Sequence, residues 1–179
     1  VKTKTGPKLL IRDCAARVPA GEVLALMGPS GAGKTTLLNT LILQPSGGSA
    51  HGSITLNGQP FTLRVYMKYA ASVAQSDTLW AHLTTQEHLE YATALMQPSL
   101  GAQGRASFVA ALLKETGMEG VAHVKAGNQF FKGLSGGQKR RLSLGVALCK
   151  KPRVVFLDEP TSGLDAAAAA SIMTFLKAT

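Results

Sequence analysis

Short apolar runs alternate along this sequence with segments whose apolar residues have helical spacing. Strand patterns occur at 9–18, 22–27, 53–58, near 63–74 and at 153–157. The runs 22–27 (EVLALM) and 153–157 (RVVFL) are brief and bounded by turn residues, which favours buried strands. The loose alternation at 9–18 suits an edge strand. The run 53–58 ends in Asn57-Gly58, a dipeptide typical of a hairpin turn.

Helical spacing dominates the rest of the chain. The predicted helices cover 34–43, 84–96, 105–116, 136–149 and an alanine-rich segment at the end, with loops at 45–53 and 98–104. Thr84 and Glu87 have the spacing of a capping box, and Asp165 is suited to cap the last helix. Pro45 stops the first helix and Gly117 ends the third. This order of elements predicts an α/β fold with a parallel core sheet, and we expect the N-terminal strands to form an antiparallel annex.

The composition is that of an ordinary globular domain and excludes few classes of protein. The 179 residues, 45% apolar and 16% charged, are enough for one globular domain with its own core. No apolar run approaches the ~18 residues that cross a bilayer, and no signal peptide opens the chain. Cys14 and Cys149 lack the spacing of a metal site or a disulfide framework, so we expect reduced thiols in a cytosolic environment.

The formal net charge of +9 leaves two interpretations open. Excess lysine and arginine attract nucleic acid, nucleotide phosphates or an anionic membrane leaflet, but a solvated basic surface fits equally well. Lys139, Arg140 and Arg141 form the densest basic cluster. Because they follow a pair of glycines, we expect them on the first turns of a helix.

The segment GPSGAGKT, residues 28–35, matches the phosphate-binding pattern G-x-x-x-x-G-K-[ST] without a departure. Its glycines allow successive backbone N–H groups to face one concavity, and the following helix adds the positive end of its dipole. Lys34 can reach the outer phosphates and the Thr35 hydroxyl can bind Mg²⁺. A glycine-rich strand–helix turn is the structural alternative. The predicted nucleotide-binding residues are Gly28, Ser30, Gly31, Ala32, Gly33, Lys34, Thr35 and Thr36.

A second chemical signal is the pair of carboxylates at the end of an apolar run, VVFLDE. In phosphoryl-transfer sites an Asp at this place holds Mg²⁺, a role that suits Asp158. Glu159, one residue later, can act as general base toward the attacking water. The motif is weak alone, because many strands end in an acidic turn, but together with a phosphate loop it indicates hydrolysis as well as binding.

At LSGGQ, residues 134–138, the sequence resembles the nucleotide-binding domain of ATP-binding-cassette (ABC) proteins. The resemblance implies a P-loop NTPase fold, in which Gln75 is the Q-loop glutamine that contacts Mg²⁺, and Asp165, in the D-loop (SGLD), contacts nucleotide. It also implies that Leu134, Ser135, Gly136, Gly137 and Gln138 contact the γ-phosphate of an ATP held by a second domain. A glycine-rich helix cap is the structural alternative. The predicted catalytic residues are Lys34, Gln75 and Glu159, and the predicted Mg²⁺ ligands are Thr35, Gln75 and Asp158.

A finer resemblance is to the G subfamily, the white and pleiotropic-drug-resistance type. It is carried by GPSGAGKTTLLNTL, DTLWAHLTTQEHLEYATALMQP and KRRLSLGVALCKKPRVVFLDEPTSGLD. Gln138 departs from that group, where many members carry Glu. The resemblance implies a single, truncated domain over 1–179, with a core of about 1–75 and 150–179 and a helical subdomain of about 76–149. We expect the switch histidine and the adenine-stacking aromatic to lie outside the chain.

Two functions from different classes follow from these motifs. The first is the ATP-hydrolysing motor of a transporter that exports lipids, sterols, pigments or xenobiotics, with ATP and Mg²⁺ as cofactors. Trp80 and Leu83 are then candidates for contact with a transmembrane coupling helix, or alternatively for core packing. The second is a soluble ABC ATPase acting on ribosomes or nucleic acid, which the positive charge suits. The spacing from Lys34 to Ser135 leaves no room for a long coiled-coil insertion and disfavours it.

The transporter interpretation also predicts the partners. These are a second nucleotide-binding domain, arranged head to tail around two ATP molecules, and a transmembrane domain that we expect on the same polypeptide. No nucleic acid is expected. The domain would then be membrane-associated and lie on the cytoplasmic face.

Overall fold

A computed structural model describes residues 2–3, 6–7, 9–44, 49–76 and 78–178. Residues 45–48 of the loop predicted at 45–53, with the helix stop predicted at Pro45, lie outside these ranges. The chain divides into two compact units, Val1–Lys68 and Tyr69–Thr179. We describe each unit by itself. The predicted boundaries between a core and a helical subdomain remain a prediction.

The smaller unit is built from short elements. Its main helix is α1, Lys34–Leu41, and its hairpins are β1–β2 (Lys2–Thr3 with Gly6–Pro7) and β3–β4 (Thr55–Leu56 with Gln59–Pro60). The turn of the second hairpin has positive φ at both Asn57 (51°) and Gly58 (78°), as a tight two-residue hairpin requires. The predicted hairpin is therefore confirmed. Each hairpin pairs with no further described strand, so the larger antiparallel annex stays a prediction.

Two strand predictions in this region are wrong, and a third, near 63–74, is confirmed only in its second half, where Ala70–Val73 form a strand. Residues 9–18 and 22–27 form no strand in the described structure, and Val23 and Met27 are 57% and 89% exposed. An apolar run becomes a strand only where another strand satisfies its backbone groups, and no described strand pairs with 22–27. The first half of 63–74 is instead helix α2, Leu63–Tyr69, because the Thr62 hydroxyl accepts the Val65 N–H and starts a helix.

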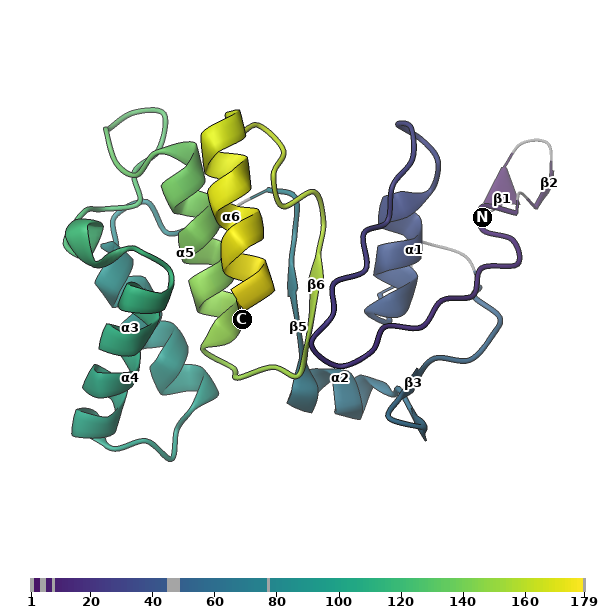
Figure 1. The fold of residues 1–179 in the computed structure, drawn as a ribbon, viewed down its shortest axis with the longest axis horizontal. Helices are drawn as coiled ribbons and strands as arrows, with labels where there is room; N and C mark the ends of the chain where they lie inside the picture. Colours follow the sequence, from purple (N-terminus) through teal and green to yellow (C-terminus); the bar gives the residue numbers. More distant parts are fainter. Residues whose placement is uncertain (1, 4–5, 8, 45–48, 77, 179) are drawn as a thin grey trace. The chain divides into compact units, whose positions relative to one another are not determined.

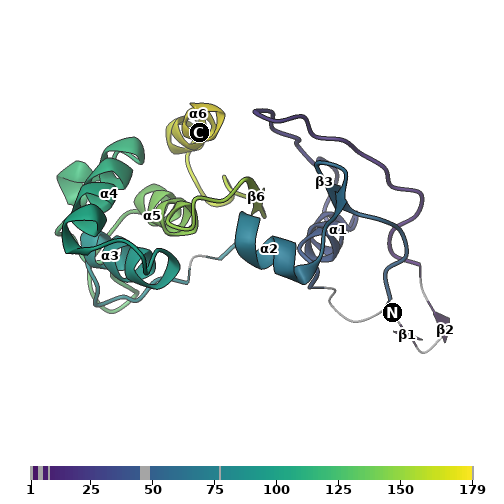
Figure 2. The same cartoon turned by 90° about the horizontal axis from the view of Figure 1, so that it is seen from below.

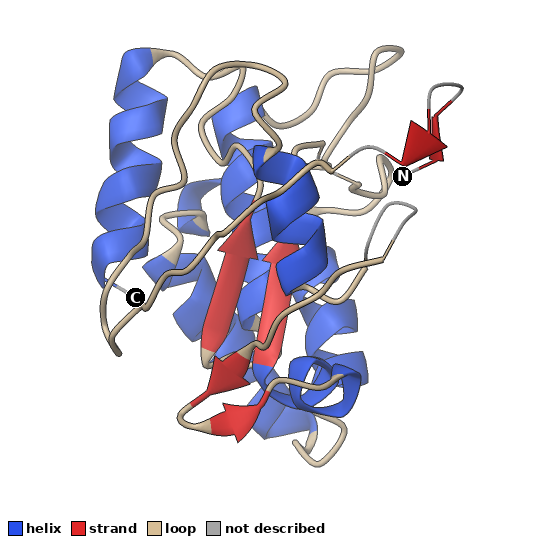
Figure 3. Cartoon of the chain, turned by 90° about the vertical axis from the view of Figure 1, so that its right-hand side faces the viewer, coloured by secondary structure: helices blue, strands red, loops and turns tan. Residues whose placement is uncertain are grey.

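The larger unit is organised around one parallel strand pair (Figures 1 and 3). Strand β5, Ala70–Val73, pairs with β6, Val154–Leu157, in the register Ala70 to Val154. The helices are α3 (Thr85–Met96), α4 (Ala102–Glu115), the short η1 (Glu119–Val121), α5 (Gly136–Leu148) and α6 (Ala166–Ala178). A parallel pair connected through helices agrees with the predicted α/β class.

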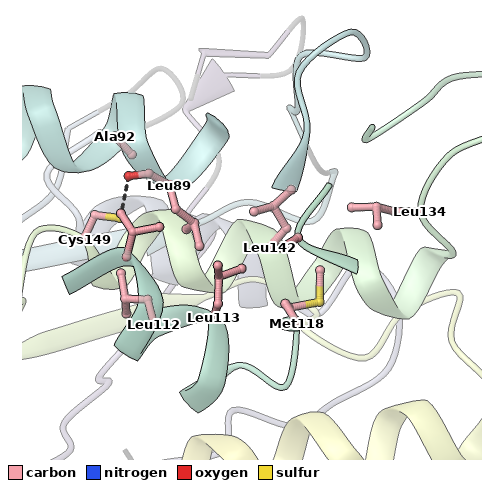
Figure 4. Packing of buried hydrophobic residues seen from close by; sticks show 10 residues of the cluster. Leu89, Ala92, Leu112, Leu113, Met118, Leu134, Leu142 and Cys149 are labelled. Atoms are coloured by element: carbon pink, nitrogen blue, oxygen red, sulfur yellow. Dashed lines mark hydrogen bonds between the residues drawn. The ribbon is translucent and has the colours of Figure 1, made fainter. Parts of the chain in front are cut away.

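Helix α5 lies between the strand pair and the helices α3 and α4, as Figure 2 shows from below. One side of α5 gives Leu142 to a cluster shared with α3 and α4, which Figure 4 shows together with Leu89 and Met118. The other side gives Leu144 to a second cluster at β5 and α6. Because α5 packs against both clusters, we expect its position to determine where the ends of β5 and β6 lie.

Local capping chemistry sets the helix ends, and here the sequence predictions are confirmed. The Thr84 hydroxyl accepts the Glu87 N–H while the Glu87 carboxylate accepts the Thr84 N–H, which completes the capping box of α3. Hydrogen bonds from Thr84 lower the pKa of Glu87, and the one from the Thr84 backbone has the largest effect. Asp165 Oδ1 accepts the Ala168 N–H at 2.9 Å and caps α6. Gly117 follows α4 with φ 63°.

Candidate functional site

The phosphate loop enters α1 through two glycines in the left-handed region, Gly31 (φ 79°) and Gly33 (φ 92°). A side chain at Gly33 would be strained there and would also approach the Leu10 carbonyl oxygen to 3.5 Å. Lys34 folds back over the loop, and its Nζ donates to the carbonyls of Gly28 (2.9 Å) and Pro29 (3.0 Å). The Lys34 ammonium group therefore lies beside the loop that is predicted to bind phosphate together with it.

The other predicted residues of this motif occupy the loop and the first turn of α1, where the first backbone N–H groups of a helix have no intrahelical acceptor. The Ala32 N–H donates to Pro29 O at 3.2 Å and shapes the turn. Ser30, Ala32 and Thr35 are exposed, and Thr36 is half-buried. Exposed donors at a helix N-terminus, a lysine and a hydroxyl form a donor set that suits a phosphate chain.

In the larger unit the two strand ends bring Gln75 and the acidic pair together. Gln75 Nε2 donates to Glu159 Oε2 at 2.7 Å, across 84 positions of sequence. The Asp158 N–H donates to Val73 O at 3.0 Å and extends the strand ladder by one step. The backbone of Glu159 has φ 44°, a conformation that few non-glycine residues adopt and that is often found at functional sites.

The donor set at these strand ends fits a magnesium ion. Asp158 offers a carboxylate and Gln75 an amide oxygen, both hard oxygen ligands. Among the described residues no group of three or more His, Cys, Asp and Glu side chains could by itself hold a metal. Mg²⁺ usually binds through one or two carboxylates and takes its remaining ligands from water and phosphate, so the oxygens of Asp158 and Gln75 are of the kind that it uses.

The segment 134–138 begins α5 with a complete capping box. Ser135 Oγ accepts the Gln138 N–H at 3.3 Å, and Gln138 Oε1 accepts the Ser135 N–H at 2.9 Å. Leu134 is buried in the cluster of Figure 4, whereas Ser135 and Gly136 are exposed. In the cap the Ser135 oxygen accepts a hydrogen bond, and a serine hydroxyl can donate its hydrogen at the same time, so the capped helix does not exclude the predicted phosphate contact.

The glycines of this segment allow α6 to approach closely. A Cβ on Gly137 would lie 3.2 Å from the Ala168 Cβ, and one on Gly136 would lie 3.6 Å from Leu164. Asp165, which was predicted to contact nucleotide, is exposed and caps α6. The capping segment and the predicted D-loop therefore lie side by side.

Sequence reasoning missed the role of Arg140. The basic cluster at 139–141 was expected on the first turns of a helix, which is confirmed, but Arg140 is only 4% exposed. Its guanidinium donates to four backbone carbonyls, those of Ala74, Gln75, Asp158 and Pro160. The only sequence signal was an arginine two residues after the LSGGQ segment, on a predicted helix with apolar residues further along it.

His88 and His82 contact neighbouring residues, whereas Trp80 lies at the surface. His88 is buried, and its Nε2 accepts the Trp80 N–H at 3.0 Å while its Nδ1 lies 2.8 Å from Thr84 O. His82 stacks on Phe131 with ring centroids 4.9 Å apart. Trp80 itself is 73% exposed and Leu83 is half-buried, so core packing does not account for Trp80.

The predicted site residues thus fall into two groups. The phosphate loop, 28–36, belongs to the smaller unit, and Gln75, 134–138, Asp158, Glu159 and Asp165 belong to the larger one. Within the larger unit the structure brings Gln75 and Glu159 into contact and places 134–138 beside the segment before α6. The meeting of the two groups around one nucleotide stays a prediction.

Comparison with known proteins places the chain in a family. The family model described as "ABC transporter" matches residues 11–162. The chain is 39% identical over 170 residues to "ABC transporter G family member STR" of Medicago truncatula, covering 94% of the chain and 21% of that protein. It is 37% identical over 177 residues to "ABC transporter G family member 6" of Arabidopsis thaliana, covering 98% of the chain and 24% of that protein.

The chain thus spans between a fifth and a quarter of the length of these curated relatives. None of the described helices is long and apolar enough to cross a membrane. The matched region includes the phosphate loop, the LSGGQ segment and the acidic strand end. The chain therefore belongs to the ABC transporter family, as a nucleotide-binding domain similar to those of its G family members.

Proposed function

We propose that this chain is the ATP-hydrolysing motor of a G-type exporter. The observation that carries the proposal is the hydrogen bond between Gln75 and Glu159, 2.7 Å long, at the ends of two parallel strands. It joins the amide predicted to bind the metal to the carboxylate predicted to act as base. A structural turn alone needs neither side chain, whereas hydrolysis needs both at one place.

In this mechanism the smaller unit binds the triphosphate. The N–H groups at the start of α1 donate to phosphate oxygens, and Lys34 exchanges its carbonyl partners at Gly28 and Pro29 for the outer phosphates. Thr35, Gln75 and Asp158 would hold Mg²⁺. When bound, that ion neutralises the charge that builds up on the phosphates during transfer.

Glu159 supplies the general base. Its carboxylate is exposed and accepts one hydrogen bond from Gln75, so the second oxygen is the one expected to take a proton from water. The water oxygen attacks the γ-phosphorus, the bond to the bridging oxygen breaks, and ADP leaves with that oxygen. Positioned bases of this kind typically contribute ~10²–10⁴-fold to rate.

The assembly that we propose is a head-to-tail pair of nucleotide-binding domains. Ser135 and Gly136, at the start of α5, are exposed, and from there the Ser135 hydroxyl and the Gly136 N–H would donate to the γ-phosphate held by the second domain. ATP binding would close the pair and hydrolysis would release it. A transmembrane domain of the same polypeptide would convert this cycle into export of a lipid, sterol, pigment or xenobiotic, with the motor on the cytoplasmic face.

The test measures ATP affinity and phosphate release separately in the full-length protein. Lys34→Ala should weaken Mg-ATP binding at least tenfold, whereas Arg64→Ala, which removes one cation from the same unit, should leave it unchanged. Glu159→Gln should bind Mg-ATP within about threefold of the parent and turn over on the order of 10² times more slowly. Unchanged affinity in Lys34→Ala, or parental turnover in Glu159→Gln, would refute the proposed function.

A further inference from the structure

The guanidinium of Arg140 joins the two loops that carry the proposed chemistry. Its NH1 donates to Ala74 O at 2.5 Å and Gln75 O at 3.5 Å, on the loop after β5. Its NH2 donates to Asp158 O at 2.7 Å, and its Nε donates to Pro160 O at 3.1 Å. These last two acceptors lie on the loop after β6. One buried side chain therefore fixes the distance between the loops.

Arginine suits this task because its planar group carries five donors in a fixed geometry. Carbonyl oxygens at strand ends have left the ladder and need another donor when they are buried. A lysine amine at the same place is a compact point donor and cannot reach both loops in a fork. The contact thus depends on the shape of the side chain as well as its charge.

Arg140 also belongs to helix α5, which Ser135 caps. The two residues are five positions apart on α5, roughly 7.5 Å along the helix axis, and α5 is buried on both sides. A rigid helix at this distance moves as one piece. A displacement at the Ser135 end therefore reaches the carbonyls of Gln75 and Asp158 through the guanidinium.

We propose that Arg140 is a positioning residue for ATP hydrolysis, which couples the LSGGQ helix to the Gln75 loop and the Asp158-Glu159 turn. The proposal rests on the proposed function and adds to it a residue that touches neither nucleotide nor metal. Arg140 holds Gln75 and Glu159 at the separation seen in their 2.7 Å hydrogen bond. Engagement of Ser135 by the second domain and readiness of the base are then linked events.

Lys150 offers a matched control, because it makes the same kind of contact at the other end of β5. Its Nζ donates to Ala70 O at 2.6 Å, and burial lowers its pKa. Lys150→Met and Arg140→Met each remove a cation that donates to a carbonyl at one end of β5. Only Arg140→Met removes a cation that contacts the loops of the proposed site.

The experiment uses the full-length protein and measures the Mg-ATP KM, kcat and melting temperature for each variant. Arg140→Met should lower kcat on the order of 10²-fold, as misplacement of catalytic groups by about 1 Å does, with KM within about threefold of the parent. Arg140→Lys should recover only part of kcat. Lys150→Met should keep the parental kcat even if it lowers the melting temperature as much as Arg140→Met does.

A double variant separates positioning from simple loss of stability. If Arg140 acts partly through Gln75, Arg140→Lys should lower kcat less in the Gln75→Ala background than it does in the parent, because one of the two groups that it positions is already absent. Fully multiplicative effects would overturn the proposal, as would parental kcat in Arg140→Lys. Arg140→Lys also keeps the test decisive if Arg140→Met fails to fold. A parent protein that binds ATP but releases no phosphate would instead refute the proposed function.

Discussion

At the scale of single residues, two cations hold the two ends of strand β5. Lys150 donates to the carbonyl of Ala70 at its start, and Arg140 donates to the carbonyl of Ala74 just after its end. Removing a charged group from water costs free energy unless hydrogen bonds replace the lost hydration. Bonds from a charged donor are roughly twice as strong as neutral ones, so carbonyl acceptors can offset that cost.

Cys149 is the residue whose reactivity the structure predicts most directly. It is fully buried, its Sγ accepts from Thr93 Oγ1 at 3.5 Å, and burial raises the pKa of its thiol while the Thr93 hydrogen bond partly opposes this. Cys14 is exposed. We expect a maleimide to label Cys14 in the native protein and to label Cys149 only after unfolding, because the thiolate is the reactive form and a raised pKa makes it scarcer at neutral pH.

Peptide mapping by mass spectrometry after timed labelling checks this prediction. Raising the pH should increase labelling of Cys149 in the denatured protein far more than in the native one. Native labelling of Cys149 as fast as that of Cys14 would contradict the burial described for α5.

At the scale of elements, a close backbone contact fixes the segment that leads into α5. A Cβ on Gly133 would lie 2.6 Å from Gly127 Cα and closer still to the Ala126 carbonyl oxygen. The neighbouring Leu134 N–H donates to that same carbonyl at 3.1 Å. We expect Gly133→Ala to lower the free energy of unfolding by about 1–3 kcal/mol, since backbone atoms cannot move aside as a flexible side chain can.

Gly120→Ala is the control for this prediction, because a Cβ there meets nothing within 4 Å. Its effect should stay within about 0.5 kcal/mol. Chemical denaturation measures the free energy of unfolding of the two variants. Equal values would show that the loop around Gly133 can move to accept a side chain.

Elements governed by local chemistry could be predicted from sequence, and those that need a distant partner could not. Thr84, Gly117 and Asp165 act on backbone groups within a few residues, so their helix ends follow from spacing. Residues 22–27 look like a strand, but a strand depends on a neighbour that the sequence does not name. The hydrogen bonds of Arg140 span 18 to 66 positions, which explains why its role needed a structure.

At the scale of the whole molecule, the chain forms two units and covers only part of the length of its relatives. The proposed motor therefore depends on surfaces that meet other domains. Ser135→Arg tests the most specific of these surfaces. The added guanidinium should occupy the space of the partner's γ-phosphate, so we expect normal ATP affinity for one domain but no closed pair.

The measurement is retention of ATP after free nucleotide is removed, in full-length protein that also carries Glu159→Gln. Ser135→Arg should abolish retention. Thr84→Arg is the matched control, because it also replaces the capping residue of a complete capping box, at a cost of about 1 kcal/mol, on a helix outside the proposed contact. Retention in the Ser135→Arg protein would mean that 134–138 only caps α5.

The exposed Trp80 gives this chain a built-in optical reporter. It is the single tryptophan of the 179 residues, it is 73% exposed, and its backbone N–H is fixed by the buried His88. The indole emission of the isolated domain should therefore be that of a water-exposed ring. Any surface that covers the ring would shift the emission to shorter wavelength and shield it from a soluble quencher, so fluorescence can follow docking at this position without an added label.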